Sequence, residues 1–215
     1  FGGQPYIAGK VPGMIRTETL KLMLAGLLIM SIILLANLRS FPSVGMILLV
    51  IIMSMLSMIG FLGWIYHFTG SARFIFTFVN SSMLIVLLTI ANSDGVHIMS
   101  RFFREARKHK DVKQAITLTM NQLLLPIFLT SITTSAAFLT MLTSPIPAMA
   151  GYGLSVGFGI LWAWILSSIF LPSLINIKKW DFSTVALTKS SFLENMVHIF
   201  GQNILKRPKI ILLSG

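Results

Sequence analysis

The sequence predicts an all-α integral membrane protein: a bundle of five transmembrane helices, followed by an amphipathic helix on the membrane surface. Of the 215 residues, 55% are hydrophobic and only 11% are charged, and the mean hydropathy of +0.85 is far above that of soluble domains. The apolar residues gather in five runs, each near or above the roughly 20 residues that a helix needs to cross the hydrocarbon layer. The basic residues lie between these runs, which favours membrane loops over nucleic-acid binding.

The predicted spans occupy most of residues 19–176, which form the expected transmembrane domain. They run from about Leu20 to Leu38, Val44 to Phe68, Phe74 to Met99, Ala115 to Leu142 and Ala148 to Ile175. Arg39 and Pro42 end the first run, because a charge and a helix stopper follow each other closely. The third run is the least uniform, since polar residues interrupt it around Asp94.

Loop charges predict the orientation. The chain has 17 Lys and Arg against 6 Asp and Glu, a net charge of +11. Antiparallel spans place 13 of the 17 basic residues on one side and four, namely Lys10, Arg16, Lys21 and Arg73, on the other. Because Lys and Arg concentrate in cytoplasmic loops, the first span enters from outside.

The flanking segments predict a piece of a longer protein. Residues 1–18 are expected to end an external domain, and residues 177–207 to form a cytoplasmic connector. In this connector, apolar residues between Ser190 and Lys206 recur at near-helical spacing, as in a helix lying on the membrane. Residues 208–215 begin a further apolar run, the expected start of the next transmembrane helix.

Several classes of chemistry lack their sequence signals. The chain has no cysteine, which excludes disulfides and thiolate metal sites. It shows no paired histidines at metal spacing, no phosphate-binding glycine loop and no nucleophile elbow. We therefore expect neither an enzyme nor a bound cofactor or metal.

Asp94 is the leading candidate for a functional residue, because it is the only acid inside the five predicted spans. A carboxylate in a bilayer costs several kcal/mol unless it is protonated, paired or hydrated, and such residues mark ion and proton pathways. With the membrane boundary near Arg101, Asp94 lies roughly 10 Å deep at helical rise. In the alternative interpretation the third helix ends earlier, and Asp94 is a solvated residue in a vestibule.

The neighbours of Asp94 suggest a polar pocket. Asn92 and Ser93 precede it, and Gly95 would let another helix approach closely. His97 follows three residues later on the same helical face. It could relay protons, or it could be an interfacial histidine near a helix end.

Two further patterns lie on the fourth and fifth spans. The fourth carries a hydroxyl cluster of Thr130, Ser131, Thr133, Thr134 and Ser135, in which Thr130, Thr133 and Thr134 share a face. These hydroxyls either hydrogen-bond one helix to another or line the Asp94 pocket and support a water chain. On the fifth span, Gly153 and Gly157 have the small-x-x-x-small spacing of tight helix packing.

Three stretches together resemble the RND superfamily of exporters, in its lipid-handling branch with the mycobacterial membrane protein large (MMPL), hopanoid-exporter, Patched and sterol-sensing-domain proteins. Ala91 to Glu105 (ANSDGVHIMSRFFRE) looks like the family's fourth transmembrane helix, and Leu129 to Leu142 (LTSITTSAAFLTML) like its fifth. The third stretch is the glycine-spaced helix through Gly151, Gly153, Gly157 and Gly159 that ends in FLPSL, Phe170 to Leu174. Many relatives place their acid one position earlier, where this chain has Ser93.

The resemblance implies that the chain holds helices two to six of a twelve-helix transporter made of two halves. It implies proton-driven export of lipid-like or hydrophobic molecules, with Asp94, Ser93 and His97 in the proton relay and Asn92, Thr130, Thr133 and Thr134 in the supporting pocket. The implied partners are protons, membrane lipid, a hydrophobic substrate, the second half and a possible second copy; the implied location is a cell membrane, the bacterial inner membrane. The alternative is a sterol-sensing type of lipid-binding module without transport.

Overall fold

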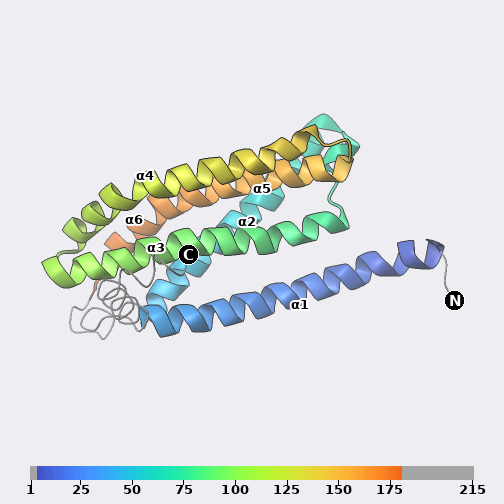
Figure 1. The fold of residues 1–215 in the computed structure, drawn as a ribbon. Helices are drawn as coiled ribbons and strands as arrows, with labels where there is room; N and C mark the ends of the chain where they lie inside the picture. The colour runs from blue at the N-terminus through green and yellow to red at the C-terminus, as the bar shows by residue number, and fades with distance from the viewer. Residues whose placement is uncertain (1–3, 181–215) are drawn as a thin grey trace, which may run out of the picture.

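The computed structural model describes residues 4–180, which form a bundle of long helices (Figure 1). The α-helices are α1 (Gln4–Leu38), α2 (Phe41–Thr69), α3 (Met83–His109), α4 (Val112–Leu139), α5 (Pro147–Ile165) and α6 (Leu171–Ile177). Short turns of helix join them: η1 (Ala72–Phe74), η2 (Phe78–Ser82), η3 (Thr140–Thr143) and the π-helical η4 (Leu166–Phe170). Within these residues five spans are long and apolar enough to cross a membrane, and there is no strand, which confirms the predicted fold class. The amphipathic helix and the last apolar run lie outside the described residues.

Two tight turns connect the spans at one end of the bundle. Arg39 and Lys110 end α1 and α3 in the left-handed conformation, with φ of 51° and 52°. Asp111 then caps α4, because its carboxylate accepts hydrogen bonds from the backbone N–H of Lys113 (2.9 Å) and Gln114 (3.5 Å). Turns this short force the consecutive spans to lie antiparallel.

The connection from α2 to α3 differs from the prediction. We expected the third span to begin near Phe74, but residues 72–82 contain two 3₁₀ turns and α3 begins at Met83. The amide oxygen of Asn80 accepts hydrogen bonds from the backbone N–H (3.2 Å) and the hydroxyl (2.6 Å) of Thr77. Such local side-chain bonds compete with helix formation.

The ends of three spans also differ from the expected boundaries. α3 continues past Met99 to His109, since its charged last turns leave the apolar layer and need not stop the helix. α1 extends back to Gln4; that residues 1–18 belong to an external domain stays a prediction. The fifth span continues through Pro172 to Ile177, with the widened turn η4 just before this proline, which has no N–H to donate to the Ser168 carbonyl.

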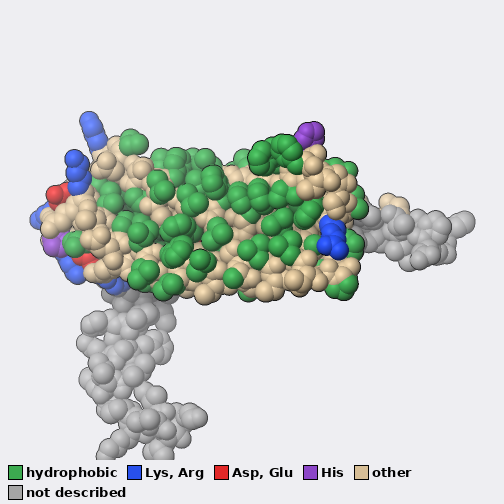
Figure 2. All heavy atoms as spheres, turned by 90° about the horizontal axis from the view of Figure 1, so that it is seen from above, with side chains coloured by type: hydrophobic (Ala, Val, Ile, Leu, Met, Phe, Trp, Pro, Cys, Tyr) green, Lys and Arg blue, Asp and Glu red, His purple; other side chains and the backbone are tan. Residues whose placement is uncertain are grey.

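The core lies among α2, α3, α4 and α5, with α1 along the edge (Figure 1). Ile47, Met58, Leu87 and Ile160 are fully buried there. Leu22, Leu28 and Ile32 of α1 stay exposed, as expected of a helix whose remaining surface faces lipid or another part of the protein. Lys and Arg side chains gather at one end of the bundle (Figure 2), the end predicted to be cytoplasmic.

Candidate functional site

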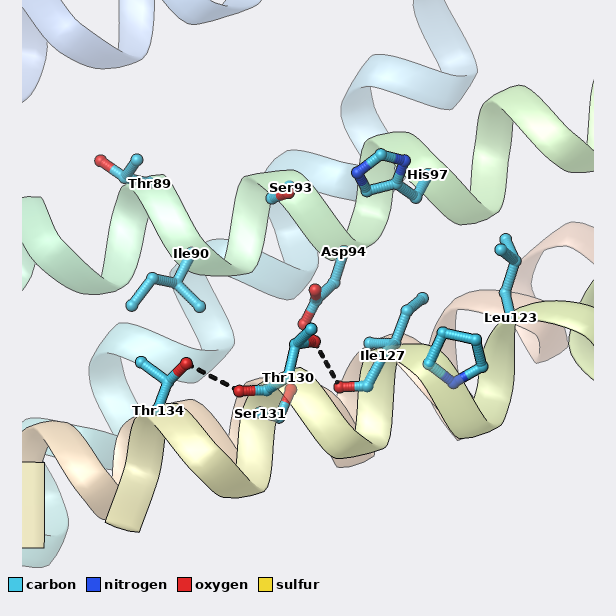
Figure 3. A pocket seen from close by; sticks show the side chains of 11 residues that line it. Thr89, Ile90, Ser93, Asp94, His97, Leu123, Ile127, Thr130, Ser131 and Thr134 are labelled. Carbon is cyan, nitrogen blue, oxygen red and sulfur yellow. Dashed lines mark hydrogen bonds between the residues drawn. The ribbon is translucent and has the colours of Figure 1, made fainter. Parts of the chain in front are cut away.

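Asp94 lies inside α3 and not at its end. Its side chain is only 7% exposed, and Figure 3 shows it pointing from α3 toward α4. The next residue, Gly95, packs against α2 so closely that a Cβ there would lie 3.0 Å from Cγ2 of Ile47. The structure therefore excludes the alternative in which the third helix ends before Asp94.

A cavity of about 450 Å³ lies between α3 and α4 beside this carboxyl group (Figure 3). Its lining comes from α3 (Thr89, Ile90, Ser93, Asp94 and His97) and from α4 (Leu123, Pro126, Ile127, Thr130, Ser131 and Thr134). It is large enough for several water molecules, each of which occupies about 30 Å³ in the liquid. The acid thus faces a space that can hold water.

One oxygen of Asp94 is left without a partner. Its Oδ2 atom is buried and has no hydrogen bond among the described residues, and neither Lys nor Arg lines the cavity. A buried carboxyl oxygen in this state is costly unless a proton, a water molecule or another ligand satisfies it. Among the described residues, the protein itself supplies no such partner to this oxygen.

Glu105, on the same helix, shows the opposite arrangement. It is 4% exposed, and its carboxylate lies 2.8 Å from Nη2 of Arg101, 3.7 Å from Nζ of Lys108 and 3.7 Å from Nε2 of His109. Basic groups thus compensate this buried acid, as is usual for structural carboxylates. The contrast marks Asp94 as the unusual acid of α3.

The α4 hydroxyls in the cavity donate to their own helix. Thr130 donates to the Ile127 carbonyl (2.8 Å) and Thr134 to the Thr130 carbonyl (2.7 Å) (Figure 3). Their oxygen lone pairs therefore remain as acceptors for water in the cavity. Two hydroxyl acceptors near an acid favour molecules that bring N–H or O–H groups.

The structure brings together most of the residues singled out from sequence. The cavity is lined by Ser93, Asp94, His97, Thr130 and Thr134. Asn92 and Thr133 lie outside its lining. The Thr133 hydroxyl is exposed and donates to the Leu129 carbonyl (2.8 Å).

Thr89 is a polar lining residue that the sequence analysis did not name, whereas Ser131 was named in the hydroxyl cluster but not assigned to the supporting pocket. Ser131 is 3% exposed and follows Thr130 in the same hydroxyl cluster. Its spacing of four residues from the buried Ile127 and Ser135 could have placed it on the inward face of α4.

Gly153 and Gly157 lie where α5 crosses α4. A Cβ on Gly153 would collide with the Phe138 carbonyl, and one on Gly157 would lie 3.0 Å from Cγ of Leu139. The Ser135 hydroxyl donates to the Gly157 carbonyl across the same contact (2.9 Å). α4 thus packs directly on α5 at this crossing, while on its other side it packs on α3 and borders the cavity.

This fold and this site define a class: a multi-pass helical membrane protein with an uncompensated acid at a polar cavity between two spans. The family model that matches the chain, over residues 1–208, is that of the MMPL family, and the chain belongs to that family. Its membership confirms the resemblance to the lipid-handling branch of the RND superfamily.

Curated relatives match parts of the chain. It is 27% identical to protein dispatched homolog 1 of Homo sapiens over 113 residues, which are 52% of this chain and 7% of that protein. It is 29% identical over 94 residues to a membrane protein of Methanocaldococcus jannaschii, covering 44% of this chain and 24% of the relative. The matched region is less than a quarter of either relative. No solved structure matches the chain significantly.

Proposed function

We propose that the chain is part of a proton-driven exporter of lipid-like or other hydrophobic molecules in a cell membrane, in bacteria the inner membrane. The observation that carries the proposal is the buried Oδ2 atom of Asp94, which has no hydrogen-bond partner among the described residues and lies at a cavity able to hold water. Membership of the MMPL family supports transport rather than catalysis. The proposal also includes the hydrophobic substrate, the second half of the transporter and any second copy of the chain.

The chemistry assigned to Asp94 is reversible protonation. When the carboxylate binds a proton it becomes a neutral acid, which tolerates a dry contact between α3 and α4. When it releases the proton, the anion needs water or the hydroxyls of α4 around it. Each protonation state therefore favours a different spacing of the two helices, and a proton gradient can drive the change.

Two neighbours of Asp94 provide a route for the proton. His97 lies one turn nearer the basic end of α3 and lines the same cavity, so it can accept the proton from water beside Asp94 and release it toward that end. Ser93 offers a hydroxyl that can both accept and donate at the cavity surface.

The test is Asp94→Asn in the whole protein, reconstituted in proteoliposomes with a hydrophobic fluorescent dye as the transported probe. We expect dye export driven by an imposed proton gradient to disappear, because the amide cannot exchange the proton. Asp111→Asn is the matched control: it removes an exposed acid, and asparagine still caps α4. Export at the normal rate by Asp94→Asn would defeat the proton role.

The same preparation distinguishes the sterol-sensing alternative. A lipid-binding module without transport would bind a fluorescent sterol in both the presence and the absence of the gradient, and would move no dye. That result would replace export by lipid sensing as the function.

A further inference from the structure

A second cavity, separate from Asp94, lies at the basic end of the bundle. It is a shallow, open hollow of about 380 Å³ between the first turns of α4 and the end of the fifth span. Its lining residues are Lys113, Ile116, Thr117, Pro172, Ser173 and Asn176. Neither the proposed proton route nor the family assignment uses this cavity.

The polar groups of the cavity fit a phosphate group with hydrogen-bond donors attached. Among the described residues, the Lys113 ammonium forms no ion pair. Asn176 adds a side-chain amide to the lining. The hydroxyls of Thr117 and Ser173 donate to the carbonyls of Lys113 (3.0 Å) and Ile169 (2.7 Å), so their lone pairs remain as acceptors.

Two charged groups close in sequence to the lining residues are engaged elsewhere. The Asp111 carboxylate accepts from the backbone N–H groups that begin α4. The Lys178 ammonium lies 4.2 Å from the centroid of the Trp180 ring, and partial burial lowers the pKa of this lysine. Lys113 is therefore the cation in the lining that can meet an anionic ligand.

Apolar surface continues from the cavity toward the middle of the membrane. Leu124 lies seven residues after Thr117 on the same face of α4, and Ile169 lies one turn before Ser173; they are 42% and 66% exposed. A phospholipid has a charged, polar headgroup followed by apolar acyl chains. This surface has the same order, because a cation and polar groups are followed by exposed aliphatic side chains.

We infer that this cavity binds the headgroup of an anionic glycerophospholipid from the leaflet at the basic end. The phosphate lies against Lys113 and the Asn176 amide, headgroup hydroxyls donate to Thr117 or Ser173, and the acyl chains follow Ile169 and Leu124. A choline headgroup carries neither N–H nor O–H donors, so phosphatidylglycerol binds better than phosphatidylcholine.

The experiment is native mass spectrometry of the whole protein in detergent, titrated with phosphatidylglycerol or phosphatidylcholine. We expect preferential binding of phosphatidylglycerol, weakened about fivefold by Lys113→Gln, the factor that one basic side chain near an anionic membrane contributes. Asn176→Leu also weakens binding. Lys108→Gln is the matched control, a half-exposed lysine at the same end that lines neither cavity.

Three results would overturn the inference. Equal loss in Lys108→Gln would show a general charge effect. Competition by soluble glycerol 3-phosphate at similar concentration would show a site for free phosphate. A disulfide formed readily between Ser173→Cys and a cysteine placed in the connector, with no lipid bound, would show that the protein itself fills the cavity. Unchanged melting temperatures of the variants establish that the fold is intact in each comparison.

Discussion

At the scale of single residues, the contact between α4 and α5 depends on the absence of a side chain at Gly153. A Cβ there would collide with the Phe138 carbonyl and lie 2.6 Å from Cβ of Met141, and backbone cannot give way as a flexible side chain can. We expect Gly153→Ala to lower the free energy of unfolding by about 1–3 kcal/mol, the usual cost of overpacking. The measurement is the thermal unfolding midpoint of the whole protein in detergent.

The control at this scale is Gly60→Ala on α2, where nothing lies within 4 Å of the added Cβ. Alanine has the better helix propensity by about 1 kcal/mol, so this variant should be as stable as the parent or more stable. Equal destabilisation by both substitutions would show that the crossing of α4 and α5 is not the cause.

At the scale of elements, α4 begins where Asp111 caps it. Asp111→Ala removes the acceptor for the N–H groups of Lys113 and Gln114, and we expect it to cost about 1 kcal/mol, whereas Asp111→Asn retains most of the stability. Urea unfolding of the two variants measures the difference. If alanine and asparagine behaved alike, the carboxylate would have no capping role.

The elements also show what sequence can and cannot reveal. Five spans could be predicted, because a run of about 20 apolar residues in a membrane satisfies its backbone hydrogen bonds by forming a helix. The start of α3 could not, because Phe74 and Phe76 are as apolar as a span, and hydropathy gives no sign of the Thr77–Asn80 bonds in the turn before α3. The widened turn η4 lies just before Pro172, which has no N–H to donate to the Ser168 carbonyl. Hydropathy carries no information about this missing hydrogen bond.

The candidate site was predictable in its residue types and less so in its geometry. Asp94 and the hydroxyl cluster are chemically conspicuous in an apolar sequence, and the structure places Thr130 and Thr134 at the same cavity. Which hydroxyls face α3 depends on the rotation of α4 about its axis. That rotation follows from packing against α5, so Ser131 lines the cavity and Thr133 does not.

At the scale of the whole molecule, transport requires that water reach the cavity beside Asp94 in the complete protein. Ser93 lines that cavity, and this chain has no cysteine, so Ser93→Cys introduces the first thiol into this part of the protein. We expect a membrane-impermeant, charged methanethiosulfonate reagent to modify it, because a thiol in contact with water can ionise and react. Leu56→Cys, near the middle of α2 and 65% exposed on the apolar surface, should stay unmodified.

The rate of this modification tests whether the proton state of Asp94 controls the helix arrangement. If protonation brings α3 and α4 together, then Ser93→Cys should react more slowly under conditions that protonate the acid, and Asp94→Asn should hold the rate low at every pH because the amide is permanently uncharged. The correction for thiol ionisation comes from an exposed cysteine at Lys179, which lines neither cavity. A rate in Asp94→Asn that equals the fast rate of the parent would show that the cavity opens independently of this carboxyl group.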